Sequence, residues 1–125
     1  MREAVLLINF KDRKKLLEIQ KILMSARILM KQVKKEEYAQ PVGALVGVKE
    51  LYKEGVVYEG EELGKDMMVF ANVSGQKLDY VLNMLRRKPL TRVDYKAILT
   101  PTNMGWTIPE LYEELSKEHE AMHNN

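Results

Sequence analysis

The chain has 125 residues, of which 46% are hydrophobic and 30% charged, with a net charge of +2 and no cysteine. This balance excludes an intrinsically disordered chain, because such chains combine low hydrophobicity with high net charge. The longest charge-free apolar run, residues 39–48, is far shorter than the ~20 residues that a membrane helix needs. The apolar stretch near the start is also too short for a signal peptide.

The absence of cysteine excludes disulfides, thiolate nucleophiles and cysteine-bound zinc, and it favours a cytoplasmic protein. A chain of this length buries about two thirds of its unfolded surface, which is enough for one hydrophobic core. We therefore expect a single globular domain over residues 1–125, without a membrane span and without an internal repeat.

The first third of the chain predicts a strand, a helix and a second strand. Residues 4–8 are apolar throughout, as in a strand that is buried on both faces. Asn9 or Asp12 can cap a helix whose apolar side chains are three and four residues apart: Leu16, Ile19, Leu23 and Ala26. Residues 28–33 predict a second strand, and the lysines in and after it mark an edge strand.

Residues 34–66 are harder to interpret. Pro41 can open a helix over residues 41–53, whose apolar side would consist of Ala44, Leu45, Val48, Leu51 and Tyr52. Gly43 and Gly47 would each weaken this helix by about 1 kcal/mol. The acidic, glycine-containing residues 59–64 predict a solvated loop.

The remaining elements have clearer signals. Residues 67–71 are apolar throughout and predict a central strand, whereas residues 93–99 alternate in polarity at first and predict an edge strand. Between them, Ser74 can cap a helix that ends before Pro89.

The last helix has the strongest start signal in the chain. Thr107 and Glu110 match a capping box, and Trp106 and Leu111 stand at the two positions of a hydrophobic staple. We expect the Trp106 ring to be mostly buried against Leu111.

Two topologies agree with these elements. If residues 41–53 are helical, the chain predicts an α/β fold with a four-stranded, mostly parallel sheet in the order 2-1-3-4, flanked by helices. If they form a loop, the alternative is an α+β, ferredoxin-like βαββαβ arrangement with an added C-terminal helix. The apolar pattern does not distinguish the two, because both place strands one and three in the centre. The helical spacing over residues 41–53 favours the α/β fold.

Polar residues follow three of the strands and make a candidate ligand-binding site: Asn9, Asn72, Ser74, Thr100, Thr102 and Asn103. In a parallel sheet the carboxyl ends of the strands lie together, and ligands bind beyond them. Hydroxyl and amide groups beside helix N-termini suit a small polar or anionic ligand. The structural alternative, which we favour, is that Thr102 and Asn103 bond the local backbone while Trp106 seals the helix start.

Residues 119–123 match the zinc motif H-E-x-x-H, in which two histidines on one helix face bind the metal. A catalytic zinc needs a third protein ligand and a walled cleft. His119 also continues the apolar stripe of the last helix, so we interpret it as a packing residue. We predict no metal, no cofactor and no identifiable catalytic residue.

Other function classes lack their signatures. The 20 basic residues are balanced by 18 acidic ones, there is no RNA-binding strand or loop motif, and a mixed solvated surface explains these charges. Nucleic acid is therefore an unexpected partner. No serine stands in a G-x-S-x-G motif, and neither a P-loop nor a dinucleotide fingerprint is present.

The tail of the chain resembles a known family. The run from Ala97 to Asn103, followed by Trp106, residues 111–115 and residues 118–119, is similar to the end of a small bacterial family known as domain of unknown function 3783. Residues 5–10 and 40–45 look similar as well. The resemblance implies a bacterial, cytoplasmic protein, and it supplies no activity or catalytic residue.

We therefore expect a small, non-enzymatic binding or regulatory module that forms a homo-oligomer through a sheet edge or the C-terminal helix. The alternative is an enzyme or sensor that binds a polar or anionic small molecule at the strand-end residues above.

Overall fold

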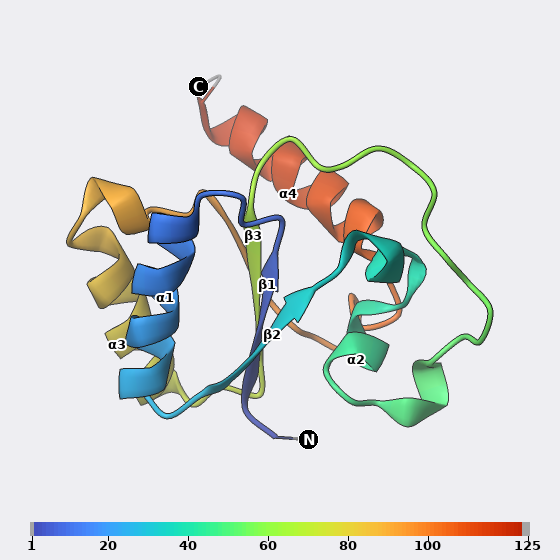
Figure 1. Cartoon of the computed structure of the whole chain (residues 1–125), viewed down its shortest axis with the longest axis horizontal. Helices are drawn as coiled ribbons and strands as arrows, with labels where there is room; N and C mark the ends of the chain where they lie inside the picture. Colours follow the sequence, from blue (N-terminus) through green and yellow to red (C-terminus); the bar gives the residue numbers. More distant parts are fainter. Residues whose placement is uncertain (1, 124–125) are drawn as a thin grey trace.

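A computed structural model describes residues 2–123 of the chain, with side chains as far as Met122. Four strands and four α-helices are joined by loops and short 3-10 turns (Figure 1). In chain order the elements are β1 (Ala4–Ile8), α1 (Arg13–Ser25), β2 (Leu29–Val33), η1 (Lys35–Ala39), α2 (Val42–Leu45), η2 (Lys49–Leu51), β3 (Met67–Ala71), α3 (Gly75–Arg86), η3 (Pro89–Thr91), β4 (Tyr95–Ile98) and α4 (Ile108–His123). Within the described part of the chain, no helix is long and apolar enough to cross a membrane.

The strands form one sheet in the order β2-β1-β3-β4, which confirms the predicted α/β fold. β1 pairs in parallel with β2, and β3 pairs in parallel with β4. The two central strands, β1 and β3, are antiparallel to each other, so the sheet is mixed. The ferredoxin-like alternative is excluded because β2 pairs with β1 rather than with β3.

The sheet consists of two similar halves. Each half is a βαβ unit, β1-α1-β2 or β3-α3-β4, and the units meet at the antiparallel β1–β3 pair. Because parallel crossovers have one hand, this arrangement places α1 and α3 on the same face of the sheet (Figure 1). The halves are thus related by an approximate two-fold axis. The two units share their topology but not their amino-acid sequence, so the symmetry is not visible as a sequence repeat.

Hydrophobic cores lie on both faces of the sheet. Alternate residues of β1 and β3 point to opposite faces, as in any strand. Val5, Leu7 and Phe70 pack under α1 and α3. Leu6, Ile8 and Val69 pack under α4, α2 and η1. Because the central strands are buried from both sides, their sequences are apolar throughout, as expected.

The expected helix over residues 41–53 is wrong in extent. α2 has only four residues, and Gly47 follows it with a φ of 106°, a conformation that a helix interior cannot contain. A second short turn, η2, comes next, and residues 52–66 contain no regular element.

Buried polar side chains hold residues 52–66 against the domain. The Gln40 amide nitrogen donates to the Lys53 carbonyl at 2.5 Å, and the Lys53 backbone N–H donates to the Gln40 oxygen at 2.9 Å. The Tyr38 hydroxyl donates to Glu62 at 2.7 Å. Burial, together with the Glu62 carboxylate, raises the pKa of Tyr38, which keeps this hydroxyl a donor. Side-chain hydrogen bonds therefore attach this segment to the domain, as backbone hydrogen bonds attach a strand to a sheet.

The start of α4 is as predicted. The Thr107 N–H and hydroxyl both lie 2.9 Å from Glu110 Oε1, and these bonds hold the pKa of Glu110 below its ordinary value. Trp106 packs against the core under α4, of which Leu111 is a part, and its ring is only partly buried.

Candidate ligand-binding site

The structure divides the predicted site residues between two ends of the sheet. Because β1 and β3 are antiparallel, Ile8 pairs with Met67 and Ala4 pairs with Ala71. Asn9 therefore lies at the end where β3 begins, and Asn72 lies at the opposite end. The expectation that Asn9 converges with the other five residues is wrong, since it assumed that β1, β3 and β4 point the same way.

The turn after β4 is held by its own side chains. Asn103 Oδ1 accepts from the Thr100 N–H at 2.8 Å, and Thr100 Oγ1 accepts from the Asn103 N–H at 3.1 Å. The Asn103 amide nitrogen donates to the Ile98 carbonyl at 3.0 Å. Thr102 is exposed. Asn103 is thus committed to local bonds, as the structural alternative predicted, and this end offers few free polar groups.

A carboxylate of the chain itself closes the start of α3. Ser74 Oγ accepts from the Lys77 N–H at 3.3 Å, which caps the helix. The Glu3 carboxylate lies against the same turn: it accepts from the Ser74 N–H at 3.0 Å and from Lys77 Nζ at 2.6 Å. These hydrogen bonds, that of Lys77 above all, hold the pKa of Glu3 below its ordinary value. The Glu3 carboxylate therefore already occupies the place at the start of α3 where a bound anion would lie.

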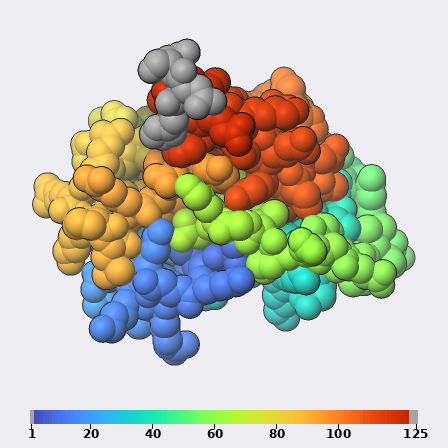
Figure 2. All heavy atoms as spheres, turned by 90° about the horizontal axis from the view of Figure 1, so that it is seen from above, coloured from blue at the N-terminus to red at the C-terminus, as the bar shows by residue number. Residues whose placement is uncertain are grey.

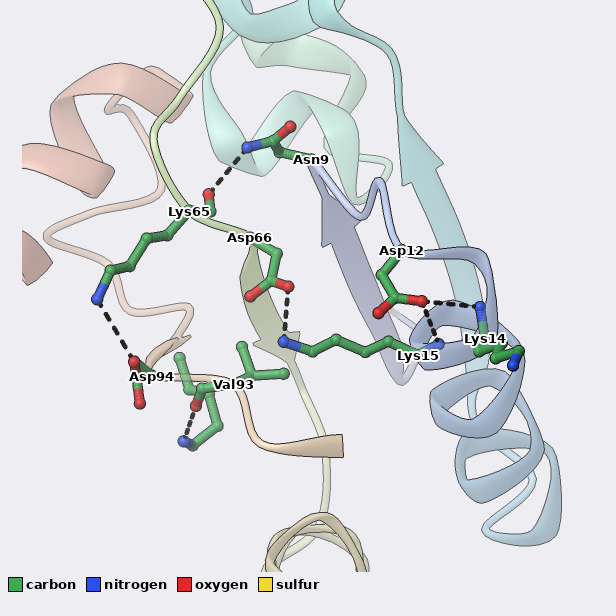
Figure 3. A network of polar contacts seen from close by, with 9 residues as sticks. Asn9, Asp12, Lys14, Lys15, Lys65, Asp66, Val93 and Asp94 are labelled. Carbon is green, nitrogen blue, oxygen red and sulfur yellow. Dashed lines mark hydrogen bonds and ion pairs between the residues drawn. The ribbon is translucent and has the colours of Figure 1, made fainter. Parts of the chain in front are cut away.

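The opposite end, at the start of α1, contains Asn9 in an unusual backbone conformation. Its φ is 62°, in the left-handed region that asparagine tolerates better than most residues. Its amide nitrogen donates to the carbonyls of Leu63 and Lys65, at 2.8 and 3.1 Å. Its side-chain oxygen is buried and has no hydrogen-bond partner in the described structure. Figure 3 shows the nitrogen facing Lys65 and the oxygen turned away from it.

A cavity of about 320 Å³ opens beside Asn9, which we call the α1 hollow. Its walls are Asn9, Lys11, Asp12, Lys15, Gly64, Lys65, Asp66, Arg92 and Asp94.

Ion pairs engage part of the charge around the α1 hollow. Lys15 Nζ lies 2.7 Å from Asp66, and Lys65 Nζ lies 3.5 Å from Asp94 (Figure 3). Asp12 caps α1 by accepting from two backbone N–H groups of the first turn.

Two cations of the α1 hollow remain. Lys11 and Arg92 are exposed and form no ion pair within the described residues. The cavity therefore has two free positive charges and an unsatisfied buried oxygen among its walls.

The two ends of the sheet are built alike, but only at the start of α3 does an acidic side chain contact the helix cap. Asp66 stands one residue before β3, just as Glu3 stands one residue before β1. Glu3 is longer by one methylene and contacts both the lysine and the helix cap, whereas only the contact with Lys15 is seen for Asp66. The loop from Asn9 to its cap is also one residue longer, and the added length includes Lys11. These differences leave open at α1 the space that is closed at α3.

His119 packs against the domain, as expected. Its ring meets that of Tyr95 edge to face, with centroids 5.4 Å apart. The side chain of His123, the second histidine of the motif, lies outside the described residues. Within the described part of the chain, no group of three histidine or acidic side chains is placed to hold a metal ion.

Of the walls of the α1 hollow, the sequence pointed only to Asn9 as a site residue. Lys15 is a cation in the first turn of α1, where it opposes the helix dipole, and the ion pair with Asp66 compensates for this. Its partner Asp66 is 51 positions away in the chain, and no sequence pattern links the two.

Residues 66–122 match the model of the family described as Domain of unknown function (DUF3783). The predicted resemblance to DUF3783 is confirmed for this stretch, which runs from Asp66 through β3, α3 and β4 into α4. The first βαβ unit lies outside the matched residues. No curated protein and no solved structure matches the chain.

Proposed function

We propose that the protein is a small, non-enzymatic binding module that takes up a small anion of the phosphate or carboxylate class in the α1 hollow. The observation that carries this proposal is the Glu3 carboxylate at the equivalent place in the other half. There, a carboxylate is bound by a lysine of the first helical turn and a backbone N–H. In the α1 half Asp66 binds Lys15 at 2.7 Å but, among the described residues, makes no such contact with the start of the helix, so the place beside the first turn of α1 is open to a free anion.

The free groups of the α1 hollow define the ligand. Asp12 already caps α1, so the binding groups are the side chains of Lys11 and Arg92, supported by Lys15. Arginine suits planar or tetrahedral oxyanions because its N–H groups bind two oxygens at once. The buried Asn9 oxygen accepts a hydrogen bond from a hydroxyl group of the ligand or from water. This bond removes the desolvation cost of an unsatisfied buried acceptor, about 1–3 kcal/mol.

Isothermal titration calorimetry with inorganic phosphate and pyrophosphate tests the proposal. The double variant Lys11→Gln/Arg92→Gln should weaken binding by about tenfold or more. The double variant Lys49→Gln/Lys53→Gln, an equal loss of charge at exposed residues in and just after η2, is the matched control and should leave the affinity unchanged. If wild type and double variant bind these anions equally, or neither binds, the proposal is wrong.

A second proposal, self-association, has its own observation. Leu29 on the edge strand β2 is 55% exposed, and the outer side of β2 shows no backbone pairing with any described residue. An open edge of this kind is a template for pairing with a second copy. Light scattering at micromolar concentration tests this: a dimer that Leu29→Lys dissociates supports it, and a wild-type monomer removes it.

We also propose that the module acts in the bacterial cytoplasm. The resemblance of its tail to DUF3783 and the absence of cysteine support this location. Fractionation of cells of the source organism, followed by detection with an antibody, checks it.

A further inference from the structure

The charges of the protein are segregated between the two faces of the sheet. The segments on the α1–α3 face, residues 11–27 and 74–94, carry 11 basic and 4 acidic residues. The segments on the opposite face, residues 34–66 and 107–123, carry 6 basic and 13 acidic residues. Figure 2 shows the first set, blue and yellow to orange, on one side, and the second, teal, green and red, on the other. The mixed surface expected from the overall balance is therefore wrong: one face is basic and the other acidic.

A groove of about 340 Å³ runs between α1 and α3 on the basic face, and we call it the α1–α3 groove. Its walls are Glu18, Lys21, Ile22, Ser25, Tyr80, Met84, Arg87, Lys88 and Thr91. Tyr80 and Ser25 bridge it through a 2.8 Å hydrogen bond between their hydroxyls, and the Tyr80 ring is still 41% exposed. Ile22 and Met84 supply apolar surface beside it.

Cations dominate the rim of the α1–α3 groove. Glu18 is its one carboxylate, and it is shared between Lys21 at 3.6 Å and Lys88 at 3.8 Å. Both distances are long for ion pairs, and both lysines are largely exposed. Arg87 is exposed and forms no ion pair within the described residues. The groove thus combines an apolar interior with unneutralised positive charge.

We infer that the α1–α3 groove binds an acidic amphipathic helix of a partner protein. Apolar side chains spaced three and four apart would contact Ile22, Tyr80 and Met84, as in other complexes where a helix lies in a groove. Carboxylates on the flanks of that helix would meet Lys21, Arg87 and Lys88, so the charges are complementary. This inference is independent of the anion site, which lies at the other end of α1.

Two other occupants fit the groove less well. A nucleic acid would bring phosphates against Glu18 and would leave the apolar interior without a partner. The acidic α4 of a second copy has its apolar side, including Ile108 and Leu111, buried in its own core. The one large apolar side chain that α4 exposes within the described residues is Met122, near its end, and one apolar side chain does not make the stripe that the groove would need.

Fluorescence anisotropy with a labelled synthetic helix tests the inference. The probe has leucines spaced three and four apart and glutamates on its other positions, and a second probe has lysines in place of the glutamates. We expect the acidic probe to bind, the basic probe not to bind, and Arg87→Glu/Lys88→Glu to weaken binding by about tenfold or more. Tyr80→Ser should weaken it similarly, because it removes the exposed ring that the leucines of the probe would contact.

The control variant is Lys49→Glu, which makes the same kind of charge change on the opposite face, and it should leave binding intact. Any of three results would overturn the inference: no binding of the acidic probe, an equal effect of the control, or tighter binding of a labelled oligonucleotide. Salt-sensitive self-association that Arg87→Glu abolishes would assign the groove to a second copy instead. Phosphate binding in the same samples reports separately on the α1 hollow.

Discussion

Lys15 and Lys77 occupy equivalent positions in the two halves of the protein. Each stands three residues after the cap of its helix, and each binds the acid that precedes the neighbouring central strand, Asp66 at 2.7 Å or Glu3 at 2.6 Å. The correspondence follows from the two-fold relation between the βαβ units. It makes the length of the acidic side chain the main difference between a closed end and an open one.

Changing the acidic side chain at position 66 should change the affinity for anions. Asp66→Glu adds the methylene that lets Glu3 reach a helix cap, so the new carboxylate should compete with a ligand and lower its affinity by about tenfold. Asp66→Asn frees Lys15 and should raise the affinity. Titration of both variants with pyrophosphate measures the two shifts, and a change of the same sign in both would contradict the proposed site.

The Glu3–Lys77 contact should make the unfolding free energy depend on pH in the acidic range. The pKa of Glu3 is lowered below its ordinary value of 4.5, chiefly by the hydrogen bond from Lys77. A carboxylate with a lowered pKa stabilises the fold above its unfolded-state pKa, and this contribution disappears as the pH falls through its folded-state pKa. Wild type should therefore exceed Glu3→Gln in unfolding free energy at neutral pH, and the difference should shrink below about pH 4.5. Urea titrations across this range measure it; a constant difference would contradict the cause given.

Gln40 should control the attachment of residues 52–66. Gln40→Ala leaves the N–H and carbonyl of Lys53 without their partners and should cost about 1–3 kcal/mol for each group that water cannot reach. Limited proteolysis should then cut this segment faster than in wild type. Gln20→Ala in α1 is a matched control, because the Gln20 side chain forms no hydrogen bond with any described residue, and its effect should be small.

The left-handed backbone of Asn9 predicts an order of stabilities. Asn9→Gly loses the amide bonds to Leu63 and Lys65 but keeps a residue that adopts a φ of 62° without strain. Asn9→Ala loses the same bonds and adds strain, so it should be less stable than Asn9→Gly by about 1 kcal/mol. Thermal or urea unfolding gives the order; equal stabilities would show that backbone conformation is not the constraint here.

Trp106 should stabilise the fold without being essential to it. Trp106→Ala removes a partly buried ring from the core under α4 and should cost about 2–3 kcal/mol, at or below the lower end of the range for fully buried aromatic residues. The backbone bond from the Val42 N–H to the Trp106 carbonyl, at 2.7 Å, does not depend on the side chain. A urea midpoint equal to that of wild type would contradict this role.

Local chemistry made much of the fold predictable. The apolar runs over residues 4–8 and 67–71 identified the two central strands, and Thr107 with Glu110 identified the start of α4. Both signals act over a few residues. The extent of the helix at residues 41–53 was wrong because spacing alone was weighed above Gly47, whose left-handed conformation belongs after a helix.

Strand direction was the information that the sequence lacked. Apolar patterning reports which strands are buried and says nothing about which way they run, so Asn9 and Asn72 were placed at one end of the sheet instead of at opposite ends. The charged walls of the α1 hollow come from three separate parts of the chain. Only the antiparallel β1–β3 pair brings Asp66 beside Lys15.

The antiparallel seam between β1 and β3 also suggests that the chain can be divided. Each half contains its own strand–helix–strand unit, and the connection between them passes through exposed residues near Gly55. A polypeptide cut there would leave two fragments, each with half of a buried sheet to cover. Neither half would be expected to persist alone in water, whereas the two together could re-form the sheet by pairing β1 with β3. Folding of this protein therefore depends on the association of its two βαβ units, which are held together by one chain.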